Sequence, residues 1–160
     1  MKNTDQPAGV AKHILTTTLI AGTLDLVSVW LIYGPIKQKT DMGKILKGIA
    51  GGAFGKSAYG GGSDMIVYGL FFHYLIACCF TLAYFLLYPK IAFLRRHVVL
   101  SGLLYGIVAW VWMNIVILPM TNVPRGPFKI EGVVIGMLLL MFFIGLPISL
   151  LTHAYYTRKK

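Results

Sequence analysis

The sequence predicts an all-α membrane protein whose four transmembrane helices form an antiparallel bundle. Hydrophobic residues make up 57% of the 160-residue chain and charged residues only 12%, whereas soluble domains carry about 25% charged residues. Four apolar runs are each long enough, as helices, to cross the ~30 Å hydrocarbon core of a bilayer. We therefore expect a single integral membrane domain over residues 1–160, with four spans at residues 14–36, 65–88, 98–118 and 132–152.

The first span, residues 14–36, contains the only charged residue of any apolar run, Asp25. An aspartate near the centre of a membrane helix carries an insertion cost of ~2.5–3.5 kcal/mol, so a partner or a proton must neutralise it. The run is too long for a secretory signal, which indicates a retained helix. Gly34 and Pro35 are expected to end this helix.

A glycine-rich connection of intermediate polarity follows, and it predicts a short helix between the first two spans. Asp41 is placed to cap the helix start, and Ile45, Ile49 and Ala53 recur at helical spacing. The segment 41–55 is too short to cross a bilayer. It is expected either to lie in the membrane interface or to re-enter the membrane.

The second span, residues 65–88, carries His73 near its middle. His73 and Asp25 each lie about eight residues from the same membrane surface, so both are expected ~12 Å below it on adjacent helices. The matching depth predicts a buried Asp25–His73 pair. Such a pair either relays protons or fixes the register of the two helices.

The third and fourth spans contain one buried polar candidate and one candidate hinge. Asn114, near the end of the third span, is expected to join the polar network or to hydrogen-bond to another helix. Pro119, Pro124 and Pro127 predict a loop before the fourth span. In the fourth span, Gly145 and Pro147 predict a hinge, because proline releases a helical carbonyl.

Fifteen Lys and Arg against five Asp and Glu give a net charge of +10. The basic residues fall between the apolar runs, where they set topology and contact anionic headgroups, so lipid rather than nucleic acid is the expected partner. Both termini are expected in the cytoplasm. The candidate headgroup-binding residues are Arg95, Arg96, Arg158, Lys159 and Lys160.

The sequence contains no pattern typical of catalysis or of a bound cofactor. The remaining histidines, His13, His97 and His153, fall at helix ends, and no HxxxH, CxxC or HExxH spacing occurs. A catalytic-triad spacing, a GxSxG elbow and a complete phosphate loop are also missing from the sequence. We therefore expect no enzyme activity, no cofactor and no metal site.

Several segments together resemble a group of small bacterial inner-membrane proteins of unknown function, broadly the YagU-like proteins. The resemblance covers residues 19–151 and is carried by GKSAYGGGSDM before the second span, His73, the turn FLRRH, the start SGLLYG of the third span, Met113-Asn114 and Gly145-Leu146-Pro147. It implies a four-helix fold in the bacterial inner membrane and assigns no reaction or substrate.

Two functions are favoured on the sequence, and a third, a haem-bearing electron carrier, would be told apart at once by the colour of the purified protein. One is a transporter or channel for a small solute or protons that uses Asp25 and His73, with the fourth span moving. Because four spans are few for a transporter, it would work as a homo-oligomer. The other is a non-catalytic accessory or assembly subunit that packs against a membrane partner. A fully enclosed polar pair would favour the accessory role, whereas a cavity reaching the pair would favour transport.

Overall fold

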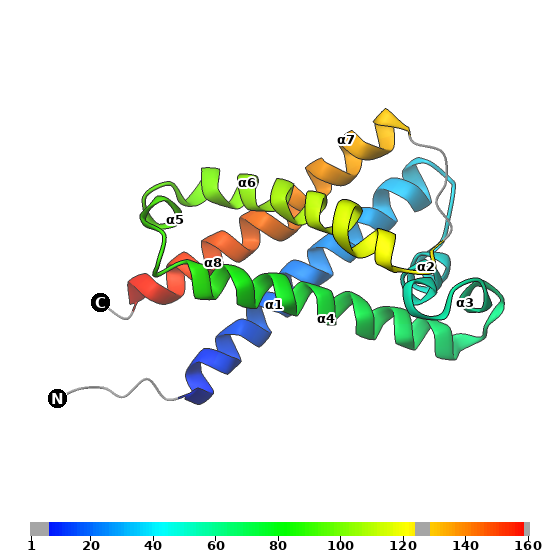
Figure 1. Cartoon of the computed structure of the whole chain (residues 1–160), viewed down its shortest axis with the longest axis horizontal. Coiled ribbons are helices and arrows are strands. Elements are labelled where there is room, and N and C mark those ends of the chain that lie inside the picture. The colour runs from blue at the N-terminus through cyan, green and yellow to red at the C-terminus, as the bar shows by residue number, and fades with distance from the viewer. Residues whose placement is uncertain (1–6, 124–128, 159–160) are drawn as a thin grey trace.

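The computed structural model describes residues 7–123 and 129–158, and every regular element within these ranges is a helix (Figure 1). Four long apolar helices are candidate membrane spans, which confirms the predicted bundle: Gly9–Ile36, Ser63–Leu87, Val98–Met120 and Ile130–Arg158. The elements in order are α1 (Pro7–Leu31), η1 (Ile32–Ile36), α2 (Met42–Phe54), α3 (Ser57–Gly60), α4 (Ser63–Leu87), α5 (Ala92–Arg96), α6 (Val98–Val111), η2 (Trp112–Ile117), η3 (Leu118–Met120), α7 (Ile130–Leu139), η4 (Leu140–Gly145) and α8 (Leu146–Arg158).

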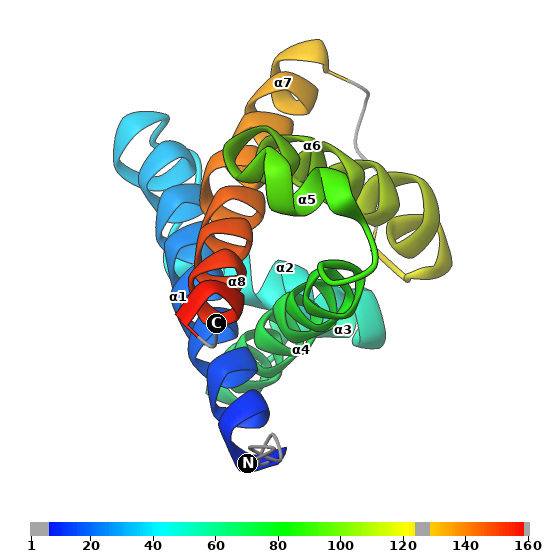
Figure 2. The ribbon, with the colours of Figure 1, turned by 90° about the vertical axis from the view of Figure 1, so that its left-hand side faces the viewer.

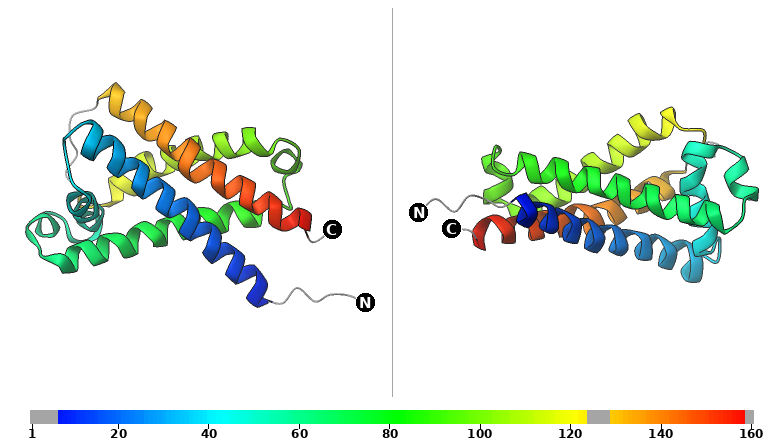
Figure 3. Two further views of the ribbon diagram at one scale, coloured as in Figure 1. Left: turned by 180° about the vertical axis from the view of Figure 1, so that it is seen from behind. Right: turned by 90° about the horizontal axis from the view of Figure 1, so that it is seen from below.

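The four spans run along the length of the molecule, so that its two ends carry different elements. The first and last helices both reach the end that carries α5, which we call the terminal end (Figures 1 and 2). The helices α2 and α3 lie at the opposite end, which we call the α2 end, and Figure 3 shows α2 running across the bundle there. The predicted short helix between the first two spans is therefore present and lies across the helix bundle.

The outer surface of the bundle is strongly apolar. Val67 is 66% exposed, Ile115 65% and Phe71 59%, and many other large apolar side chains of the spans are exposed as well. A soluble monomer rarely shows apolar patches of this extent. Lipid chains covering the four spans explain the surface directly.

Hydrogen bonds inside the bundle join three spans towards the terminal end. The fully buried Tyr84 of α4 places its hydroxyl 2.9 Å from Oγ of Ser101 in α6 and 2.9 Å from Oγ of Ser149 in α8. Both serines donate to the carbonyl oxygen of Val98. This cluster fills the interior beside Ile148 and holds α4, α6 and α8 together.

Three of the four spans contain a π-helical segment: η1, η2 and η4. The segment η4 ends directly before α8, in which Pro147 is the second residue. The fourth span is thus interrupted where Gly145 and Pro147 predicted, and the hinge itself stays a prediction. π-Helical turns are frequent at functional sites.

Asp41 caps the start of the helix α2, as predicted. The carboxylate oxygen Oδ1 of Asp41 accepts a 2.9 Å hydrogen bond from the Lys44 amide. The face of α2 that packs on α4 contains Leu46 and Ala50 rather than the predicted stripe. The residues of that stripe line cavities instead, because α2 lies across the bundle and turns one face to α4 and another to the interior.

The start of α2 is expected to loosen in acid. The hydrogen bond from the Lys44 amide lowers the pKa of Asp41, so its charged form stabilises α2 above the ordinary aspartate pKa of about 4. This contribution is lost as the pH falls through the lowered pKa. Hydrogen exchange at the α2 amides, corrected for intrinsic rates, should therefore accelerate as the pH falls from about 5 to about 2.

Asp41→Asn is the matched control for this prediction. Asparagine caps a helix about as well as aspartate but does not titrate in this range. The variant should keep its α2 protection unchanged over the same pH interval. Equal acceleration in both proteins would show that another group causes the loosening.

Candidate solute-binding cavity

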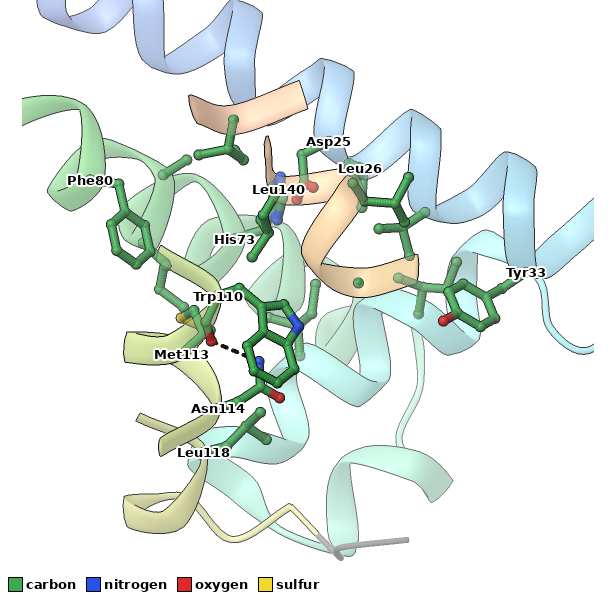
Figure 4. Close-up of a pocket in the computed structure, with 18 of the residues that line it drawn as sticks. Asp25, Leu26, Tyr33, His73, Phe80, Trp110, Met113, Asn114, Leu118 and Leu140 are labelled. Carbon is green, nitrogen blue, oxygen red and sulfur yellow. Dashed lines mark hydrogen bonds between the residues drawn. The ribbon is translucent and has the colours of Figure 1, made fainter. Parts of the chain in front are cut away.

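A cavity of about 520 Å³ lies between the four spans towards the α2 end (Figure 4). Its lining residues recur at helical spacing on each element. They are Asp25, Leu26, Val29 and Tyr33 from the first span, Ile45 and Ile49 from α2, His73, Ile76, Ala77 and Phe80 from α4, Trp110, Met113, Asn114 and Leu118 from the third span, and Gly132, Gly136, Leu139, Leu140 and Ile144 from the fourth. Cavities of ~300–1,000 Å³ lined mainly by apolar groups are typical of small-molecule sites.

Asp25 lies in the cavity wall with its carboxylate without a partner. Its Oδ1 atom is buried and makes no hydrogen bond to any described residue. The hydroxyl of Ser28 donates to the backbone carbonyl of Asp25 and leaves the side chain free. A charged carboxylate in such a place is unfavourable until a proton or a cation neutralises it.

The predicted Asp25–His73 pair is wrong. Nε2 of His73 lies 2.7 Å from the carbonyl oxygen of Gly22, and no ion pair joins His73 to Asp25 among the described residues. Gly22 lies one helical turn before Asp25 on the same face of α1, and without a side chain it lets α4 approach closely. The imidazole therefore reaches a backbone carbonyl first.

A second contact beside Gly22 fixes this arrangement. The Thr23 hydroxyl lies 2.7 Å from the Tyr74 hydroxyl, again joining α1 to α4. Asp25 and His73 nevertheless line the same cavity, as their matching depth predicted, and Figure 4 shows their side chains close together in its wall. They are neighbours without being partners.

Asn114 also lines the cavity, but it makes neither of the predicted interactions. It is exposed rather than buried, and Nδ2 donates a 2.9 Å hydrogen bond to the carbonyl oxygen of Trp110 in the same helix (Figure 4). The carbonyl accepts this bond where the third span changes to its π-helical segment η2.

The sequence reasoning missed the aromatic residues of the cavity. Tyr33, Phe80 and Trp110 all line it, although Tyr33 and the aromatics of the second span are readily explained as interfacial or lipid-facing residues. A usable signal exists for one of them. Trp110 lies four residues before Asn114 and therefore on the same helix face.

A second cavity of about 500 Å³ adjoins the first and is almost entirely apolar. The two cavities share five lining residues: Ile45, Ile49, Ile76, Met113 and Leu118. The second one extends between α2, α4 and η2, where Phe72 and Ile117 contribute to its wall. The two cavities therefore form adjoining compartments for an apolar molecule.

The other candidate residues lie away from the cavity, at the terminal end. His153 Nδ1 is 2.5 Å from the Tyr88 hydroxyl, His13 stacks on Tyr155, and His97 precedes α6. Within the described ranges, no three His, Cys, Asp or Glu side chains converge as metal ligands. The predicted headgroup residues Arg95, Arg96 and Arg158 are exposed there, whereas Lys159 and Lys160 lie outside the described residues.

Comparisons with known proteins identify no relative. No family model, no curated protein and no solved structure matches the chain. The functional argument therefore rests on the cavity and its residues.

Proposed function

We propose that this four-span membrane protein carries a small solute across the membrane in exchange for a proton bound at Asp25. The observation that carries the proposal is the buried, unpartnered carboxylate oxygen of Asp25 in the wall of a cavity of about 520 Å³. Buried ionisable groups at membrane depth typically mark ion and substrate pathways. A purely structural residue would instead be enclosed and hydrogen-bonded.

The surroundings of Asp25 suit alternate binding of a proton and a solute. His73 is engaged by the Gly22 carbonyl, so it does not satisfy Asp25 in place of a ligand. The remaining wall is mostly apolar, which makes an unneutralised carboxylate unfavourable. Asp25 is therefore neutral while it holds a proton, and releasing that proton into an empty cavity is disfavoured.

The two ends of the cavity differ in a way that fits alternating access. At the α2 end its wall includes α2 and the first residues of the fourth span. Towards the terminal end, the Tyr84 cluster closes the interior. Opening that side requires the fourth span to move, and the proposed hinge at Gly145 and Pro147 lies on it. We propose that two or more copies act together, because four spans are few for a transport path.

The same proposal places both termini in the cytoplasm of a bacterium, with the protein in the inner membrane. The resemblance to YagU-like proteins supports this location. The described basic residues of the terminal end lie in short segments directly beside the spans, where lysine and arginine favour the cytoplasmic side. They are Lys12, Lys90, Arg95, Arg96 and Arg158. Anionic headgroups are their proposed partners.

Proton flux into liposomes tests the proposal. The purified protein is reconstituted with an entrapped pH-sensitive dye, and a pH gradient is imposed. Four solutes that share a phenyl ring but differ in charge are then added: benzyltrimethylammonium, benzenesulfonate, benzyl alcohol and phenylalanine. We expect at least one to drive proton movement above the rate in protein-free liposomes. Asp25→Asn should reduce that flux to the protein-free rate, because the amide cannot bind and release the proton.

Asp64→Asn is the matched control, since Asp64 is an exposed carboxylate in the first turn of α4. It should keep the native flux. Full flux in Asp25→Asn would contradict the proposal. Absence of flux with all four solutes, in a protein that remains folded and monodisperse, would contradict it as well and would favour the accessory role.

A further inference from the structure

The described side chains that line the cavity include one acidic group and no lysine or arginine. Among the described residues that line either cavity, Asp25 is the only carboxylate and none is a lysine or an arginine. The other titratable side chains facing the first cavity are Tyr33 from η1 and His73 from α4; α2 and the third and fourth spans contribute none. The described lining therefore offers a negative charge and no lysine or arginine to pair with it.

Three aromatic rings line the cavity whose wall contains Asp25. Tyr33, Phe80 and Trp110 come from three different spans and line the same cavity (Figure 4). Aromatic faces attract cations, most strongly when the cation is already removed from water. A carboxylate combined with several rings is the chemistry that recognises an organic ammonium group.

The rest of the lining favours a hydrocarbon body over a small hydrated ion. Ile76, Met113 and Leu140 lie in the wall of the first cavity, and the adjoining second cavity is almost entirely apolar. A metal cation would need several oxygen ligands, and the site provides one carboxylate. A hydrated alkali ion would lose its water without replacement.

We infer that the cavity binds lipophilic ammonium ions, with the positive nitrogen at Asp25 and the hydrocarbon body between Trp110 and the aliphatic wall. The ammonium ion neutralises the carboxylate that a proton otherwise occupies, so cation and proton compete for one site. An anionic solute would meet the carboxylate, and a neutral solute would leave Oδ1 without a partner. This inference rests on the proposed function, because it names the class of solute that the same cavity binds.

Direct binding by the full chain in detergent tests the inference without any transport. Trp30→Phe and Trp112→Phe leave Trp110 as the single tryptophan, so its fluorescence reports occupancy of the cavity. The probes are benzyltrimethylammonium, whose charge is permanent, and its uncharged carbon analogue 2,2-dimethylpropylbenzene, which has the same shape. At mildly alkaline pH we expect the cation to bind about tenfold more tightly or better, since its charge neutralises a desolvated carboxylate and is attracted by the aromatic rings.

Two further measurements separate charge recognition from general hydrophobic binding. Asp25→Asn should bind the two probes with equal affinity. In the native protein, acidification should lower the affinity for the cation and leave the affinity for the carbon analogue unchanged. Equal binding of cation and carbon analogue by the native protein would overturn the inference, as would tighter binding of benzenesulfonate. If the cation shows no preference while another solute drives proton flux, the inference fails and the proposed function stands.

Discussion

Gly106→Ala is expected to lower the free energy of unfolding by about 1–3 kcal/mol or more, because overpacking a close helix contact forces the backbone apart. A Cβ atom at Gly106 would lie 2.3 Å from Cα of Met141 and 2.6 Å from the carbonyl oxygen of Leu140. These are backbone atoms of η4, so no side chain can rotate away. Reversible unfolding in mixed micelles measures the loss.

The same contact can be tested from the opposite helix. A Cβ atom at Gly145 would lie 2.1 Å from the carbonyl oxygen of Gly102, so Gly145→Ala should destabilise the protein to a similar extent. Gly132→Ala is the matched control in the fourth span, because nothing lies within 4 Å of its Cβ position. If Gly106→Ala lowers the free energy of unfolding no more than the control does, the two helices separate easily and the prediction is wrong.

The close contact also bears on the proposed hinge. A Cβ atom at Gly145 would overlap backbone atoms of α6, so the fourth span cannot bend there without changing its contact with the third span. Any movement that opens the terminal end therefore involves both helices together. Small residues at this contact permit such a joint movement. They let the two helices pack backbone to backbone, and two helices packed in this way can adopt two discrete relative positions.

The spans could be predicted from the sequence because the bilayer imposes a minimum length of apolar residues. Helix ends were harder to predict. The fourth predicted span ends at residue 152, whereas the helix continues to Arg158, and the first helix begins at Pro7 rather than at residue 14. Hydrophobicity marks the part of a helix that lies in lipid, and a polar helix can continue beyond that part.

The sequence predicted the depth of the site residues in the membrane but not their partners. Counting residues from the helix ends placed Asp25 and His73 at one level, and both line one cavity. The partner of His73 is the Gly22 carbonyl, and a backbone acceptor leaves no side-chain signal in a sequence. The cavity wall includes residues of α2, which crosses the end of the bundle, and of the π-helical segments, and hydrophobic periodicity reveals neither feature.

Asp25→Leu is expected to raise the free energy of unfolding by about 1–3 kcal/mol while abolishing proton-linked flux. The native carboxylate oxygen is buried without a partner, and an unsatisfied buried polar group costs an amount of this order. Functional sites are commonly retained at the expense of stability. Unfolding in mixed micelles and liposome flux, measured on the same preparation, check both parts of the prediction.

A double-mutant cycle with His73→Phe shows whether Asp25 and His73 act as a pair. His73→Phe alone should lower the free energy of unfolding by about 1 kcal/mol, because the bond to the Gly22 carbonyl is lost. Since the two side chains share no hydrogen bond, the effects of Asp25→Leu and His73→Phe should add to within about 0.5 kcal/mol. A coupling well above this value, with Asp25→Leu destabilising, would mean that the two residues pair in the membrane. Asp25 would then already have a partner, and the cavity would lose the free carboxylate on which proton exchange depends.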